Sequence, residues 1–131
     1  MSFIHEVGHL LDHRALVRAT PGCATANIPN NGLSAWARAI LQTPEVAQLG
    51  LLGESSANAA RVGYYLDVSE LWARSYTQWV AMRSGDSTLL DALNKIRKSV
   101  DPLTAATHWH GAHFTVVGQE IDAIFRTRGW I

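Results

Sequence analysis

The sequence predicts a mainly α-helical, single-domain fold over residues 1–131. A chain of this length fits one domain, and its hydrophobic fraction of 47% is enough for one core. Apolar residues recur at helical spacing in several segments, which capping residues, Pro or Gly delimit. No segment alternates apolar and polar residues as a half-buried strand does. We therefore expect roughly five or six helices, without repeats or linkers.

The first helix is predicted over residues 2–18. Ser2 is a typical capping residue, and Thr20-Pro21-Gly22 is a typical stop. Helical spacing predicts an apolar stripe that faces the core and consists of Phe3, Val7, Leu10, Leu11 and Leu16. Residues 20–32 are predicted to form a loop, since they end in the turn signal Pro29-Asn30-Asn31-Gly32.

Two shorter helices follow. Ser34 can cap a helix that continues to Leu41. Thr43-Pro44-Glu45 indicates another start, with Pro at the first helical position and an end near Gly50 or Gly53. Residues 53–63 are small and polar, so we expect a mobile loop there.

The second half of the chain has stronger helix signals. Ser69 precedes a long helix to about Arg83, which Gly85-Asp86 closes. A further helix is capped by Ser87 and runs to about Lys98, and Asp101-Pro102 marks a turn or a short helix. The last helix is predicted over residues 111–128 and ends at Gly129.

Charge and composition exclude several classes of partner. The 11 basic and 11 acidic residues cancel, and no basic block stands out, so we expect no nucleic-acid partner. No apolar run is long enough for a membrane span, and no signal peptide is evident. We expect a cytoplasmic protein, with a lost N-terminal signal as the open alternative. Cys23 is the single cysteine, which rules out an internal disulfide framework. The oligomeric state stays open.

His5-Glu6-Val7-Gly8-His9 forms an HExxH motif. Residues four apart lie on one face of a helix, so His5 and His9 can point at one metal ion. Zinc suits imidazole ligands, and a catalytic zinc site has three protein ligands and one open position. Glu6 follows the first histidine directly, from where it can act as a general base on water. The short motif also arises by chance, so a third ligand is what makes it specific.

A third ligand six residues after His9 is excluded, because Ala15 occupies that position. Another class of zinc site takes a glutamate from a second helix, and Glu70 in the segment Tyr64–Tyr76 is the candidate. The alternative for Glu70 is an ion pair with Arg74, since i,i+4 pairs are common on helices.

Glu70-Leu71-Trp72-Ala73-Arg74 resembles the ExFAR third-ligand helix of gluzincin metallopeptidases, with Trp72 in place of the usual Phe. The HExGHxxD pattern from His5 to Asp12 resembles the same group. The similarity is to anthrax lethal factor-like peptidases and to zincin-like domains of phage and prophage proteins. Residues 114–130 also resemble the tail of these phage-type domains. The resemblance implies a zinc metallopeptidase that hydrolyses a peptide or protein substrate. Zn²⁺ would then be held by His5, His9 and Glu70, with Glu6 as the catalytic base.

Other residues near the two motifs have weaker assignments. In peptidases of this kind, a tyrosine near the third-ligand helix donates a hydrogen bond to the oxyanion. The resemblance assigns this role to Tyr64 or Tyr65. For Tyr65 the alternative is packing in the core. Asp12 can orient a ligand imidazole or be a surface charge. His13 continues the histidine stripe, but three ligands over two turns spread along roughly 12 Å, so we interpret His13 as a surface residue.

Two further groups are assigned no chemistry. His108, His110 and His113 form a second histidine cluster, but matching Cys or carboxylate spacing is missing, so a separate metal site is disfavoured. Trp72, Tyr76 and Trp79 have core spacing. Nothing near Cys23 in the sequence activates its thiol.

Gluzincins normally place a small β-sheet before the HExxH helix, and four residues precede His5 here. We therefore expect the domain to be truncated at its N-terminus or unusually short, with that sheet missing. This leaves two alternatives to an active peptidase. One is an inactive zinc-binding module derived from a zincin. The other is a metal-free helical interaction module of a phage or prophage protein.

Overall fold

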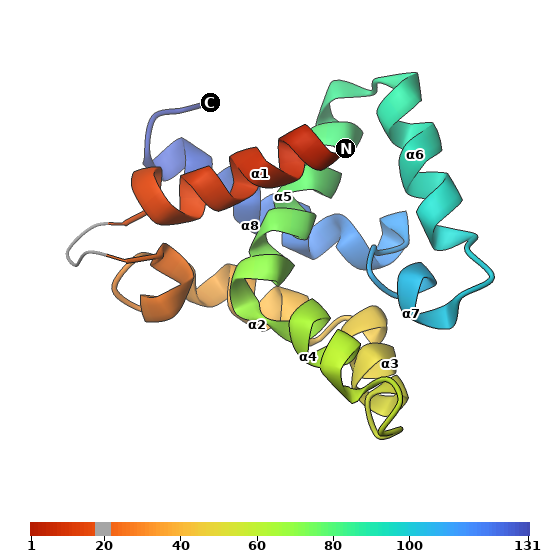
Figure 1. Cartoon of the computed structure of the whole chain (residues 1–131). Helices are drawn as coiled ribbons and strands as arrows, with labels where there is room; N and C mark the ends of the chain where they lie inside the picture. The colour runs from red at the N-terminus through yellow and green to blue at the C-terminus, as the bar shows by residue number, and fades with distance from the viewer. Residues whose placement is uncertain (18–21) are drawn as a thin grey trace.

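Eight α-helices make up most of the chain in the computed structural model, which describes residues 1–17 and 22–131. No β-strand occurs within these ranges, so the predicted mainly α fold is confirmed. Figure 1 shows the helices in chain order. Their bounds are α1 Ser2–Leu10, α2 Ser34–Leu41, α3 Pro44–Leu52, α4 Ala59–Leu66, α5 Val68–Ser84, α6 Ser87–Arg97, α7 Pro102–Ala105 and α8 Gly111–Thr127.

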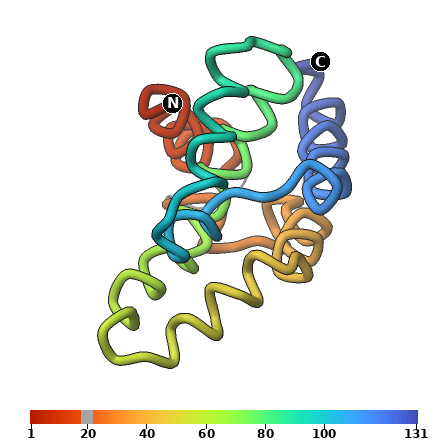
Figure 2. The backbone as a smooth tube through the Cα atoms, turned by 90° about the vertical axis from the view of Figure 1, so that its right-hand side faces the viewer, coloured from red at the N-terminus to blue at the C-terminus, as the bar shows by residue number. Residues whose placement is uncertain are grey.

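Helix α5 is the centre of the fold. Helices α1, α4, α6 and α8 all pack against it, with α1 and α8 on opposite sides (Figures 1 and 2). Its N-terminus is capped by Asp67, whose carboxylate accepts a hydrogen bond from the Ser69 N–H. Its C-terminus ends at Gly85, where φ of +66° is a left-handed conformation that glycine adopts without strain. The helix therefore has defined ends and presents a fixed set of side chains to its neighbours.

The main core lies between α2, α5 and α8. Three tryptophans are fully buried or nearly so, and the rings of Trp36 and Trp72 meet edge to face at 5.2 Å. Their indole N–H groups are satisfied inside the core, Trp36 by the Ser75 hydroxyl and Trp72 by the Gly8 carbonyl. Tyr76 and Trp79 pack against the same cluster, so the predicted core role of these aromatic residues is confirmed.

Helices α3 and α4 lie side by side at one end of the molecule (Figure 2). Val62 of α4 is buried there against Leu49 of α3, together with Leu103 and Ala106. The predicted loop over residues 53–63 is therefore wrong in its second half, where α4 begins at Ala59. The small residues of this segment do form a helix, because Val62 gains a buried position that composition alone does not show.

The first helix also differs from its prediction. The α-helix ends at Leu10 and continues as one π-helical turn over Leu11–Ala15. Residues 18 to 21, which include the predicted end of this helix and part of the predicted stop signal, lie outside the described residues. Leu16 is fully buried as expected, but Phe3 and Leu10 are 81% and 57% exposed. The predicted stripe is therefore wrong at Phe3 and Leu10, because α1 approaches α5 through Gly8, and confirmed at Leu11 and Leu16, which belong to or pack against the core.

The other predicted helices agree closely with α2, α3, α5, α6, α7 and α8. The predicted caps at Ser2, Ser34 and Ser87 are each displaced, since these residues are the first of their helices and Met1, Leu33 and Asp86 occupy the N-cap positions. No helix in the described ranges combines the length and the hydropathy needed to cross a bilayer.

Candidate metal centre

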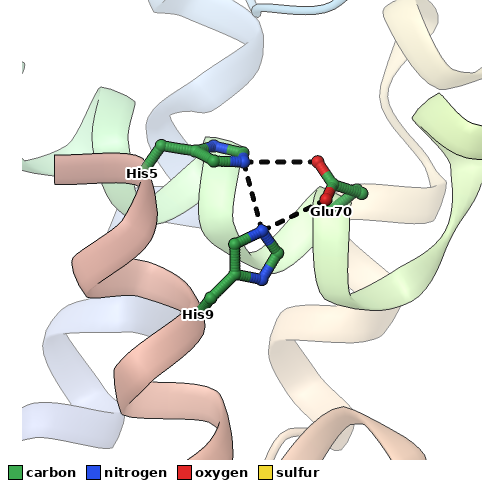
Figure 3. Close-up of side chains that lie close together, drawn as sticks. All are labelled: His5, His9 and Glu70. Carbon is green, nitrogen blue, oxygen red and sulfur yellow. Dashed lines mark hydrogen bonds and ion pairs between the residues drawn. The ribbon is translucent and has the colours of Figure 1, made fainter. Parts of the chain in front are cut away.

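Helices α1 and α5 bring together the three predicted metal ligands. His5 and His9 lie on successive turns of α1, and Glu70 lies in the first turn of α5 (Figure 3). The two helices cross very closely, because a Cβ at Gly8 would lie 2.9 Å from the Ala73 Cα. Gly8 thus carries the ligand helix into contact with the backbone of the helix that holds Glu70.

The donor atoms of the three side chains converge on one point. The His5 and His9 Nε2 atoms are 3.2 Å apart. The Glu70 carboxylate places Oε2 3.3 Å from His5 Nε2 and Oε1 3.1 Å from His9 Nε2. Figure 3 shows the two imidazoles and the carboxylate pointing toward one another. Within the described residues, this is the group of His, Cys, Asp or Glu side chains that could hold one ion.

These separations fit a zinc ion. Zinc–ligand bonds of about 2.0–2.1 Å in a tetrahedral arrangement put neighbouring donor atoms about 3.3–3.4 Å apart. The Nε2–Nε2 separation of 3.2 Å is close to that value, as are the shortest distances to the carboxylate, 3.3 Å from His5 to Oε2 and 3.1 Å from His9 to Oε1. Two imidazole nitrogens and one carboxylate are also a donor set that zinc accepts. The residues present therefore fit the metal that the motif implies, with the fourth position left for water or substrate.

The site favours the neutral form of one ligand. Burial lowers the pKa of His5, against an opposing effect of the Glu70 carboxylate, which raises it. A neutral imidazole is the form that binds a metal ion, so this shift supports ligation.

Glu6 lies beside the ligand group on α1 and is exposed. Its carboxylate is near enough to His5 to raise the pKa of that imidazole. A solvated carboxylate next to the donor group has access to water, as a general base requires.

The two tyrosines differ in what they contact. Tyr64 is 56% exposed, and burial of its hydroxyl raises the pKa of the phenol, as does an interaction with the Glu70 carboxylate. Tyr65 is half-buried, and its ring lies under the guanidinium groups of Arg61 and Arg74, at 5.9 and 5.6 Å from the ring centroid. Tyr64 is therefore the tyrosine that reaches the ligand group, and Tyr65 packs beside it.

Arg74 does not form the ion pair that the sequence left open. Its Nε donates to the Glu70 main-chain carbonyl, while the Glu70 carboxylate faces the two histidines. The guanidinium also donates to the carbonyls of Thr107 and Tyr65. Sequence reasoning missed this role, because the i,i+4 spacing of Glu70 and Arg74 favours a side-chain pair and says nothing about distant carbonyls.

Asp12 has neither of its predicted roles. Its side chain is fully buried, and its two oxygens accept hydrogen bonds from the Thr25 N–H and hydroxyl, both at 2.8 Å. It anchors the segment Ala24–Asn27, a 3-10 turn, to the end of the ligand helix. His13 is exposed, as predicted for a surface residue.

The C-terminal histidine cluster divides into two places. His113 Nδ1 lies 2.8 Å from Glu45 Oε1, which also accepts the His110 N–H. His108 is buried instead beside the candidate metal centre, where burial and the Arg74 charge lower its pKa to about 3. The three residues therefore do not act as one group. Cys23 is a half-buried free thiol.

A cavity of about 280 Å³ opens beside the ligand group. It is open to solvent and lined by residues of α1, α4, α5, α6 and the α7 region, namely Met1, Ser2, His5, Tyr64, Tyr65, Glu70, Arg74, Thr77, Ile96, Thr104, Thr107 and His108. The candidate ligands His5 and Glu70 thus form part of its wall.

Comparison with known proteins found no relative: no family model, no curated protein and no solved structure matches this chain significantly.

Proposed function

We propose that this chain carries a zinc-dependent peptidase site of the HExxH…E kind. The observation that supports it is that His5 Nε2, His9 Nε2 and one oxygen of the Glu70 carboxylate lie within 4.8 Å of one another, although they come from helices distant in sequence. The ligands of a zinc site must come together in this way, and here the third one comes from a second helix.

Each residue has a distinct task in this proposal. His5, His9 and Glu70 hold the ion, which when bound would act as a Lewis acid toward water and a substrate carbonyl. Glu6 takes a proton from water and passes it to the leaving amine of the peptide. Tyr64 donates a hydrogen bond to the oxygen on which negative charge develops. The adjacent cavity accommodates a substrate residue.

The first test measures zinc content by elemental analysis of protein purified without chelator. We expect about one zinc per chain, as for a site with three protein ligands, and none in a His5→Ala/Glu70→Ala double variant. A His13→Ala variant is the matched control, because His13 lies on the same helical segment, is exposed and should leave zinc content unchanged. A native chain that holds no zinc after reconstitution would overturn the proposal.

The second test separates catalysis from metal binding. Glu6→Gln should keep the zinc and lose hydrolysis of a peptide library, since the amide cannot accept the proton. Hydrolysis that survives in Glu6→Gln contradicts the assigned base. Zinc binding without hydrolysis by the native chain would support an inactive zinc-binding module instead.

A further inference from the structure

We propose that the cavity beside the metal centre binds a carboxylate of the substrate, with the buried guanidinium of Arg74 as its counter-charge. This inference rests on the proposed function in one respect: the carboxylate belongs to a substrate only if the neighbouring metal centre is a peptidase site. His5 and Glu70 belong to both the cavity and that centre. Binding of the carboxylate itself depends only on the cavity and Arg74.

The size of the cavity suits one residue. Its volume of about 280 Å³ is near the lower end of ligand pockets, roughly 300–1,000 Å³. Ile96 of α6 and the half-buried ring of Tyr65 supply apolar wall, and His5, Glu70 and Arg74 supply polar groups. Such a pocket accepts an apolar body with a polar end.

Arg74 supplies the charge. It is 5% exposed, and none of the ion pairs among the described residues includes it. Its hydrogen bonds go to the three main-chain carbonyls of Tyr65, Glu70 and Thr107, whereas a guanidinium has five N–H donors. A buried cation without a paired anion is unfavourable, so an entering carboxylate would gain a charge-assisted contact.

The other groups around the cavity increase this preference. Burial lowers the pKa of Arg74 to about 10, and the Glu70 carboxylate opposes this shift only in part, while its oxygens face His5 and His9. His108 stays neutral near pH 7, because burial and the Arg74 charge lower its pKa to about 3. The cavity should therefore prefer an anion to a neutral group and reject a cation.

The test uses three probes of the same shape and different charge: 3-phenylpropanoate, 3-phenylpropanamide and 3-phenylpropylammonium. Their affinities for the full chain are measured by calorimetry, with zinc and after chelation. We expect the carboxylate to bind roughly tenfold to a hundredfold more tightly than the amide in both forms, since hydrogen bonds to charged groups are the stronger ones. The ammonium should not bind. Equal affinity of carboxylate and amide in the chelated chain overturns the proposal, and this result is independent of whether zinc binds.

Two variants locate the bound carboxylate. Arg74→Gln should remove the preference for carboxylate over amide. Since Arg74 also holds three carbonyls, Ile96→Trp serves as a second variant that fills the cavity from α6 without touching those hydrogen bonds. It should weaken binding of the carboxylate probe about tenfold or more, because a probe excluded from the filled cavity loses its contact with Arg74. Arg83→Gln is the control on the same helix, because Arg83 is exposed, pairs with Asp122 and lies outside the cavity. Unchanged carboxylate binding in folded Arg74→Gln or in Ile96→Trp would overturn the proposal.

A displacement assay distinguishes the two sources of a carboxylate. One competitor is an acetylated peptide with a free C-terminus and no acidic side chain. The other is the amidated peptide with one internal glutamate. Displacement of phenylpropanoate by the first peptide alone supports recognition of a C-terminus. Displacement by the second peptide alone supports recognition of an acidic side chain. Failure of both would contradict a peptide carboxylate as the natural occupant.

Discussion

Gly8 and Ala73 are packed so closely that any side chain at Gly8 would collide with the backbone of the facing helix: an added Cβ would lie 2.9 Å from the Ala73 Cα and 3.2 Å from its carbonyl oxygen. The contact lies between the two histidines of α1 and one turn beyond Glu70 of α5. The distance between the helices therefore sets the distance between the candidate ligands.

Gly8→Ala should force α1 away from α5. We expect a loss of about 1–3 kcal/mol in the free energy of unfolding, as for overpacked cores, and weaker zinc binding because the imidazoles move away from Glu70. Urea denaturation and zinc titration measure the two effects. Gly50→Ala is the matched control: Gly50 lies within α3, and an added methyl group there would meet no atom within 4 Å, so this change should be neutral or slightly stabilising. Equal behaviour of the two variants would show that the close crossing is not required.

Asp12→Ala should destabilise the fold without removing the metal ligands. The Thr25 N–H and hydroxyl would lose their buried acceptors, which we expect to lower the free energy of unfolding by about 2–4 kcal/mol. Thr25→Val, which removes only the hydroxyl bond, should have a smaller effect. Both are measured by urea denaturation alongside zinc content. A variant at Asp12 that keeps its stability but loses zinc would instead assign this carboxylate to the histidine ligands.

His108 should make the protein less stable in mild acid. Its pKa is lowered from 6.5 to about 3 by burial first and by the Arg74 charge second, so below pH 6.5 the unfolded chain binds a proton that the folded chain does not. Stability therefore falls as pH drops from 6.5 toward 3, by about 2 kcal/mol at pH 5 from this group. His108→Asn should lose this part of the pH dependence in urea denaturation at pH 7 and pH 5. His13→Asn, at an exposed position, should keep the native profile; the reverse result would contradict the assignment.

Tyr64→Phe should lower kcat roughly a hundredfold, the usual effect of removing one donor to a developing oxyanion, and leave zinc content unchanged. Tyr65→Phe should change kcat little, because the ring of Tyr65 packs under Arg61 and Arg74, whereas the phenol of Tyr64 interacts with Glu70. Steady-state kinetics on a cleaved peptide compare the two. A larger loss of kcat in Tyr65→Phe than in Tyr64→Phe would contradict this assignment and make Tyr65 the hydrogen-bond donor.

Much of the local structure was predictable from sequence. The i,i+4 spacing places His5 and His9 on one face of a helix whatever surrounds it, and Pro44 and Gly85 mark a helix start and a helix end through their own backbone preferences. Glu70 could be named as a candidate third ligand because the two motifs are recognisable as patterns of letters. These features depend on residues close together in the chain, and such residues carry their geometry with them.

Tertiary structure decided which faces and partners these local elements use. Phe3 and Leu10 had the spacing of a core stripe, yet α1 turns the side of Gly8 toward α5, because the glycine permits a closer backbone contact than any apolar side chain would. The hydrogen bonds from Thr25 to buried Asp12, and from Arg74 to the Thr107 carbonyl, also join segments distant in sequence. Spacing within one helix carries no information on such contacts, because their energies arise only when separate helices exclude water from a shared interface.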